Sequence, residues 1–214
     1  MNDAWWTTTL CVPDEPVPRL AIMEKSFPGS CVVNRDGKRF ANESQNYMAF
    51  QKDLFKTHTD EHPNAPAWHV FDATFRENFM VGPLMTKAMK PDSQIPKKWF
   101  DEGFVAKADT IRELADMLGI DADGLEGTIG KMNHYAETGK DEDFGRGDSA
   151  YDRYYADPAI KPKPCLAPIV KAPFYAMRIE AGDFGTLGGL DTDTDARVKK
   201  ADGGVFEGLF AVGN

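Results

Sequence analysis

The spacing of apolar residues predicts a helix near position 50. Four large side chains recur at i, i+3, i+7 and i+8 and therefore line one helical face: Tyr47, Phe50, Leu54 and Phe55. Either Asn42 or Ser44 would cap its N-terminus, and the prolines of the run 58–66 would end it.

Two further amphipathic helices are expected between positions 110 and 139. Thr110 and Glu113 form a capping box, and Gly119 ends the helix that they open. Asp121 begins the next helix, which runs to Gly139. Two such helices with a short connection usually pack antiparallel against a common sheet or core.

Short apolar runs predict strands over much of the remaining chain. Residues 1–30 and 140–168 are rich in proline or polar residues and are expected to be irregular. The composition changes near 168–173, which is the best candidate boundary. Two hairpins are expected, one of 31–34 with 39–41 and one of 196–198 with 205–206. Single strands are expected at 68–72, 174–179 and 209–214.

Composition excludes several classes of protein. The chain has 214 residues, 42% of them hydrophobic and 28% charged, which is typical of a globular domain. Its net charge of −9 disfavours a nucleic-acid partner. No stretch has the length and apolarity of a membrane helix, and the three cysteines form no CxxC pair. We therefore expect a cytoplasmic protein with reduced thiols.

Two runs have the spacing of metal sites, but neither fits one. His58, Glu61 and His62 match the zinc spacing HxxEH, yet Pro63 ends the helix that the ligands need. The alternating aspartates of 191–195 lack the glycine and glutamate of a calcium loop. No metal site is predicted. The four glycines of 182–189 form neither GxGxxG nor a P-loop, and taken alone they indicate a turn.

Several motifs in register resemble one family. Residues 33–43 (VNRDGKRFANE) are similar to the VNxxGxRFxNE signature of flavoproteins related to fumarate reductase and 3-ketosteroid dehydrogenase. Residues 141–147 (DEDFGRG) and 151–155 (YDRYY) resemble the ketosteroid dehydrogenase branch, and 182–190 and 208–214 agree with it. The resemblance covers nearly the whole chain.

The resemblance implies an α+β fold with two domains. A Rossmann-like FAD domain is interrupted by a cap (substrate) domain, which would span 42–168. Residues 1–41 and 169–214 would be flanking β-rich segments of the FAD domain. The family's N-terminal GxGxxG is absent. The chain is therefore expected to be an internal fragment, with the missing parts of its own FAD domain as partners and little catalysis alone.

The resemblance also implies FAD as cofactor and an oxidoreductase acting on CH–CH bonds. Hydride would pass between an apolar cyclic ketone, such as a steroid, and flavin N5. The family's cap tyrosine aligns with Phe79, which lacks a hydroxyl, so Tyr47 is the catalytic candidate. Phe55, Phe79 and Val105 are expected to contact substrate. The expected cofactor-binding residues are Gly185, Thr186, Gly188, Gly189, Gly213 and Asn214.

Two alternatives stay open on the sequence alone. One is a reductase of the fumarate reductase type, which would need a cationic substrate clamp from Arg76, Arg146 or Arg153. The family histidine of those reductases is replaced by Gly185, which argues against a dicarboxylate substrate. The other alternative is a domain that binds a small apolar ligand and performs no chemistry.

Overall fold

The computed structural model describes residues 3–213. They divide into two compact units, residues 7–182 and residues 3–6 together with 183–213. The fold mixes helices with antiparallel sheet, as the sequence predicts. None of the helices within residues 3–213 is both long and apolar enough to cross a membrane.

A mixed-length antiparallel sheet forms the centre of the larger unit. Its order is β2 (Arg19–Ala21), β1 (Asp3–Leu10), β6 (Phe174–Leu187), β4 (Ala67–Phe71) and β3 (Ser30–Val33). A further strand, β5 (Val105–Ala108), pairs with β6 through Val105 opposite Met177. Every residue of β4 is buried, which is expected of a central strand covered on both faces.

Alternation along the strands separates two hydrophobic clusters. Ala67 and Phe71 of β4 belong to one cluster, whereas Trp68 and Val70 belong to the other. Successive side chains of a strand point to opposite faces of its sheet. The two clusters therefore lie on opposite faces.

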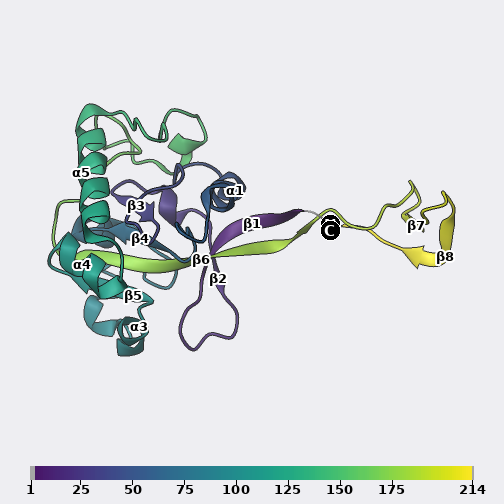
Figure 1. The fold of residues 1–214 in the computed structure, drawn as a ribbon, viewed down its shortest axis with the longest axis horizontal. Coiled ribbons are helices and arrows are strands. Elements are labelled where there is room, and N and C mark those ends of the chain that lie inside the picture. The colour runs from purple at the N-terminus through teal and green to yellow at the C-terminus, as the bar shows by residue number, and fades with distance from the viewer. Residues whose placement is uncertain (1–2, 214) are drawn as a thin grey trace. The chain divides into compact units, whose positions relative to one another are not determined.

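One face is covered by α4 (Ile111–Leu118) and α5 (Ala122–Thr138), which lie side by side (Figure 1). The predicted capping box is confirmed, since Thr110 and Glu113 each bond the other's backbone N–H. Both helices end at glycines with positive φ, Gly119 at 66° and Gly139 at 75°. Leu114 and Leu125 bring the helices onto Trp68 and Val70 in one cluster.

The other cluster is covered by shorter helices. These are α1 (Tyr47–Thr57), α2 (Ala73–Asn78) and α3 (Lys97–Asp101). The 3₁₀ turn η2 (Asp92–Gln94) lies between α2 and α3, whereas η1 (Glu24–Ser26) precedes β3 and η3 (Asp152–Tyr155) follows α5. Phe50, Leu54, Phe75 and Trp99 carry the helices onto this face.

The smaller unit contains one hairpin, as predicted. Strands β7 (Arg197–Lys199) and β8 (Val205–Phe210) pair antiparallel around the turn 200–204. Val198 is 3% exposed, and it anchors the hairpin's inner side.

Two strand predictions near the N-terminus are wrong. Residues 31–34 do not pair with 39–41, because β3 pairs with β4 instead and Arg39 is engaged in ion pairs. Residues 1–30 are not irregular throughout, because buried threonines place β1 in the sheet and β2 pairs with it. The intervening prolines mark the connection between these strands.

Three element boundaries also differ from prediction. The first helix begins after Asn46, whose side chain accepts the N–H of Ala49, because Asn42 and Ser44 bond other segments. Strand β6 continues through the glycine-rich run, where Gly182 leaves room for the side chain of Thr9. The last strand is 205–210 rather than 209–214, because it pairs with β7. The predicted domain boundaries at 42 and 168 stay a prediction.

Gly37 provides a test of the packing against α5. Its φ is +68°, and a Cβ there would clash with the backbone N of Leu125 and lie 2.7 Å from the carbonyl oxygen of Asp121. Gly103 has nearly the same φ, +67°, with nothing within 4 Å. We expect Gly37→Ala to lower the free energy of unfolding by more than about 3 kcal/mol.

The matched variant Gly103→Ala should lose about 1–2 kcal/mol, the strain of the left-handed region alone. Urea unfolding of both variants measures the difference. Equal losses would contradict the close packing of Gly37.

Candidate functional site

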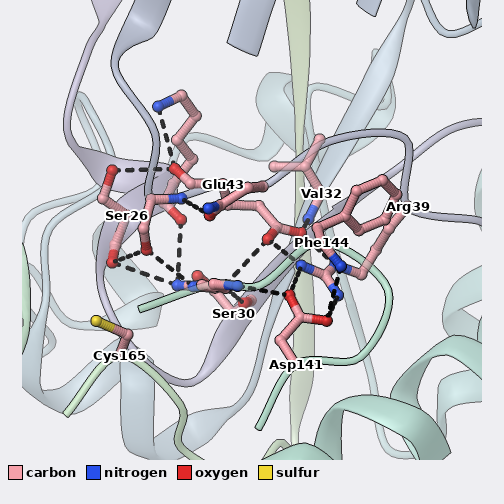
Figure 2. Close-up of polar contacts among 12 residues, drawn as sticks. Ser26, Ser30, Val32, Arg39, Glu43, Asp141, Phe144 and Cys165 are labelled. Carbon is pink, nitrogen blue, oxygen red and sulfur yellow. Dashed lines mark hydrogen bonds and ion pairs between the residues drawn. The ribbon is translucent and has the colours of Figure 1, made fainter. Parts of the chain in front are cut away.

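A network of buried ion pairs joins the segment before α1 to the loop 141–147 (Figure 2). Arg39 donates to both Glu43 oxygens, at 2.8 and 2.7 Å, and to both Asp141 oxygens, at 3.0 and 2.8 Å. The Arg39 side chain is 3% exposed and both carboxylates are fully buried. Bidentate pairs of this kind fix orientation as well as charge. Residues far apart in the sequence are thereby held in one arrangement.

Arg146 extends the network to the start of β3. It is fully buried and lies 3.4 Å from the Glu43 carboxylate. Its guanidinium donates to the carbonyl oxygens of Ser30 (2.7 Å) and Phe27 (2.8 Å). It also donates to the Ser44 hydroxyl at 3.0 Å. Arg146 therefore connects three chain segments by hydrogen bonds.

The charges of the network keep its carboxylates ionised. Burial favours the protonated form of Glu43, but the positive charges of Arg39 and Arg146 outweigh it and hold the pKa of Glu43 below its usual value. Burial of Asp141 is likewise outweighed by Arg39, which lowers the pKa of that carboxyl. Both groups are acceptors only in this state.

The network residues are the same residues that carry the family resemblance. Arg39 and Glu43 belong to the first signature, and Asp141 and Arg146 to the DEDFGRG motif. Their roles are structural, which the sequence analysis missed. The spacing of Arg39 and Glu43, four residues apart with opposite charge, was a visible signal. Nothing in the sequence pointed to Asp141 as the third member.

The arginines that a dicarboxylate clamp would need are used elsewhere. Arg146 bonds backbone carbonyls as described above, and the buried Arg76 donates to the carbonyl oxygens of Met85 and Lys90. Arg153 donates to the carbonyl oxygens of Gly147 and Asp148. These contacts disfavour the alternative of a fumarate reductase type.

The predicted catalytic residue, Tyr47, is the first residue of α1 and is half-buried. It lies within electrostatic reach of the tyrosines around η3. Burial, together with Tyr155, Tyr47 and Tyr154, raises the pKa of Tyr151. Asn42 joins the two segments by donating to buried Asp152 at 2.9 Å. Tyr47 therefore lies near enough to Tyr151 to affect its pKa, and the sequence analysis assigned no role to Tyr151.

Phe79 lines a cavity of about 380 Å³ between α2 and the loop 157–170. Its ring stacks on Phe27, with centroids 4.9 Å apart, and Phe27 also meets Tyr155 edge-on at 6.1 Å. The cavity is large enough for a small ligand. Its lining is largely apolar: Pro28, Phe75, Phe79, Ile160, Ala167, Pro168 and Val170, with Asp72, Thr74, Asn78, Asp157 and Lys161 as polar members and Gly29 at its edge.

The other predicted substrate residues lie apart from this cavity. Phe55 is on α1 and 42% exposed. Val105 is 1% exposed and packs within the hydrophobic cluster of β5 and β6. Their contact with substrate stays a prediction.

Predicted cofactor-binding residues gather in the smaller unit. Thr186, Gly189 and Gly213 line one cavity of about 310 Å³, together with Leu190, Thr192, Ala211 and Val212. Gly188 and Gly213 have φ of 96° and 81°, and a Cβ on either would meet nothing within 4 Å. Gly189 and Gly213 line the cavity with bare backbone, and Gly188 precedes Gly189 in the chain. A flat ring system can approach such a surface closely. We call Thr186, Gly188, Gly189 and Gly213 the glycine cradle.

Gly185 adjoins the glycine cradle with φ of 150°. Asn214 lies outside the described residues. Within residues 3–213, no group of three or more His, Cys, Asp or Glu side chains is arranged to hold a metal ion. His62 instead pairs with Asp36 at 2.6 Å, and His58 accepts the N–H of Asn64.

Comparison with known proteins gives a consistent family. The sequence matches the FAD binding domain family over residues 1–214. It is 44% identical to 3-oxosteroid 1-dehydrogenase of Mycolicibacterium smegmatis, covering 100% of this chain and 37% of that protein. It is 39% identical to 4-oxocyclohexanecarboxylate 2-dehydrogenase of Sinomonas cyclohexanicum, covering 100% of this chain and 36% of the relative.

Solved structures agree. The crystal structure of 3-ketosteroid Δ1-dehydrogenase from Sterolibacterium denitrificans with 1,4-androstadiene-3,17-dione matches 97% of this chain and 36% of that one, at 43% identity and a TM-score of 0.89. An open flavocytochrome c3 fumarate reductase shares the fold, with a TM-score of 0.59 at 24% identity. The chain spans a little over a third of its relatives' length.

Replacing Glu43 with glutamine tests the network. Glu43→Gln removes one buried charge and leaves Arg39 and Arg146 without full compensation. We expect the free energy of unfolding at pH 7 to fall by about 3–5 kcal/mol. Asp101→Asn, which breaks an exposed pair with Lys97, should change it little. Urea unfolding measures both.

The same variant has a pH signature. Because the pKa values of Glu43 and Asp141 are lowered in the fold, their stabilisation is present above about pH 4, the unfolded range, and is lost as pH falls through the folded values. Glu43→Gln should therefore show a shallower loss of stability on acidification than the wild type. An unchanged acid slope would contradict the network's charge assignment.

Proposed function

Because the chain belongs to the FAD-binding flavoprotein family, we propose that it forms part of an FAD-dependent dehydrogenase that oxidises an apolar cyclic ketone, such as a 3-ketosteroid, at a carbon–carbon bond. The relatives named above include dehydrogenases of 3-oxosteroids and of an oxocyclohexane carboxylate. The observation that carries the proposal is the glycine cradle, in which three residues predicted from the sequence line one cavity.

The glycine cradle fits the flat ring of FAD. Gly188 and Gly189 present backbone without side chains, and Thr186 supplies a hydroxyl at the same cavity. FAD, when bound, supplies the capacity to accept hydride. The residues of this chain that would hold it are Gly185, Thr186, Gly188, Gly189, Gly213 and Asn214.

The protein's own contribution to the chemistry is proton handling and substrate placement. We assign Tyr47, in its phenolate form, as the group that takes the proton from the carbon beside the ketone. The phenolate becomes a neutral phenol and the substrate an enolate, a general-base role. The apolar wall around Phe79 suits a substrate of fused or single carbocycles, since such sites are lined by apolar side chains with few polar groups. Phe55 and Val105, which lie outside this cavity, stay further candidates for substrate contact.

The division into domains also belongs to this proposal. Residues 42–168 act as the cap, and 1–41 with 169–214 belong to the FAD domain. Apolar side chains of the smaller unit are exposed: Leu190, Phe206, Leu209, Phe210 and Val212. A lone two-stranded hairpin is marginally stable. In the proposed arrangement, further segments of the same FAD domain pack against these exposed side chains.

Flavin binding by the full reading frame that contains this chain tests the cofactor assignment. Gly189→Ala adds a methyl at the cavity, 3.8 Å from the Gly213 carbonyl oxygen and at ordinary φ. We expect at least about a tenfold loss of FAD affinity, because the added group occupies space that the ring needs. Absorbance at flavin wavelengths during titration with FAD measures it.

The control is Gly203→Ala in the hairpin turn, which has positive φ (89°) and open space. It should carry the backbone strain and keep FAD affinity. Absence of flavin from every form, wild type included, would overturn the cofactor assignment and leave a ligand-binding domain.

Tyr47→Phe tests the proton-transfer role. We expect kcat for oxidation of 4-androstene-3,17-dione by the full reading frame to fall by about 10²–10⁴-fold, with KM changed little, since the ring is kept and the hydroxyl is lost. Tyr154→Phe, at a side chain 76% exposed, should retain activity. A Tyr47→Phe enzyme with normal kcat would contradict the assignment.

A further inference from the structure

Lys25 is a buried ammonium that the sequence analysis and the proposed chemistry leave unexplained. It is 3% exposed and belongs to η1. Its Nζ donates to the carbonyl oxygens of Glu43 at 3.1 Å and Gln45 at 3.2 Å. The same nitrogen lies 4.9 Å from the ring centroid of Phe50. A lysine rarely reaches this degree of burial unless it is paired.

These contacts hold the turn that leads into α1. Gln45 precedes the cap residue Asn46, whose side chain accepts the N–H of Ala49. Tyr47 follows as the first helical residue, and Phe50 is the fourth, at the end of the first turn of α1. Gln45 is held further by its side-chain hydrogen bond to Asp53, at 2.8 Å. The Lys25 ammonium thus contacts both the turn 43–46 before α1 and the first turn of the helix.

We propose that Lys25 is a positioning residue for Tyr47: its ammonium fixes the backbone of residues 43–45 and so sets where the Tyr47 phenol lies. The inference rests on the proposed function, in which Tyr47 transfers the proton. Lys25 acts through backbone and through Phe50. Proton transfer depends steeply on placement, and an error of about 1 Å costs on the order of 10²-fold in rate.

The surroundings of Lys25 set its titration. Burial, the largest effect, lowers the pKa of Lys25 to about 8, and Arg146 acts in the same direction. Glu43, Glu24 and Asp152 raise it. Burial lowers the pKa of His69 on β4 to about 3, and the positive charge of Lys25 acts in the same direction. The imidazole is therefore neutral over this pH range. Lys25 is therefore mostly charged at pH 7 and mostly neutral at pH 9.

Keeping this charge works against stability. Because the folded pKa lies below the unfolded value, Lys25 opposes folding most strongly below pH 8, and that opposition fades as pH rises towards 10.5. A methionine at the same place would avoid the desolvation. Without the ammonium, the carbonyl oxygen of Gln45 would lose its hydrogen bond from Lys25, which offsets part of that gain. The carbonyl oxygen of Glu43 would still accept from the Ser26 hydroxyl at 3.0 Å. A destabilising charge in η1 that bonds the turn before Tyr47 points to positioning.

The neutral amine is expected to hold the turn less firmly. Hydrogen bonds from a charged donor are about twice as strong as those from a neutral one, and attraction of the cation to the Phe50 ring disappears with the charge. The turn 43–46 should therefore loosen as pH rises through about 8.

The first experiment uses the 214-residue chain and NMR between pH 6.5 and 10. We expect the amide resonances of Gln45, Asn46 and Tyr47 to shift with a midpoint near the Lys25 pKa of about 8, which the side-chain Cε resonance reports independently. In Lys25→Met the shifts should disappear. In the control variant Lys56→Met, at an exposed position on α1, the pH-dependent shifts should persist. A titration midpoint of Lys25 near 10.5 would overturn the proposal. So would amide resonances of residues 45–47 that do not shift at the Lys25 midpoint.

The second experiment measures oxidation of 4-androstene-3,17-dione by the full reading frame. We expect Lys25→Met to lower kcat by about tenfold at pH 7 with KM nearly unchanged. The wild type should show an alkaline decline in kcat with a midpoint near 8, and Lys25→Met should lack it. The denaturation midpoint of Lys25→Met at pH 7 should stay near that of the wild type, which separates positioning from a general loss of fold.

The outcomes distinguish the two proposals. If no form oxidises the steroid while the NMR coupling is seen, the proposed function fails and the link between Lys25 and the Tyr47 turn stands as a structural fact. If the wild type is active and Lys25→Met matches its kcat and pH profile, the positioning role is overturned.

Discussion

An ionised glutamate with no exposed surface constrains the larger unit more than any other single group. Glu43 is tolerable in the interior only with compensating charges beside it. Arg39 and Arg146 supply them, and each brings further demands: Arg39 needs Asp141, and Arg146 needs backbone carbonyls at the start of β3. The segments before β3, before α1 and after α5 must therefore assemble together or leave a buried charge unpaired.

This dependence changes what the family signature means. Its charged residues build a scaffold, so a match to the signature reports membership in the family and says little about substrate. Substrate must be read from residues outside it, such as Phe79 and the apolar wall around its cavity. Under the proposed function, the scaffold also influences the chemistry indirectly. Asn42 and Glu43 lie on the turn that carries the chain into α1 and on to Tyr47.

Local signals were predictable from the sequence, and long-range ones were not. The capping box at Thr110, the helix ending at Gly139 and the hairpin 197–210 follow from interactions a few residues apart. The hairpin expected at 31–41 failed because β3 finds its partner in β4, much later in the chain. The N-cap was misplaced for the same reason, since Asn42 is engaged by Asp152.

The candidate site shows the same division at the level of chemistry. The glycine cradle was expected from the family resemblance, because the glycines taken alone indicated only a turn. Thr186, Gly189 and Gly213 line one cavity, and flavin binding there stays a proposal. The surroundings of Tyr47 were hidden, because only the fold brings Lys25 onto the carbonyl oxygen of Gln45, two residues before Tyr47, and Tyr151 within electrostatic reach of Tyr47. Backbone shape can be encoded residue by residue. The placement of the Tyr47 phenol, the proposed proton-transferring group, depends on contacts between several segments, so it cannot be deduced from neighbouring residues alone.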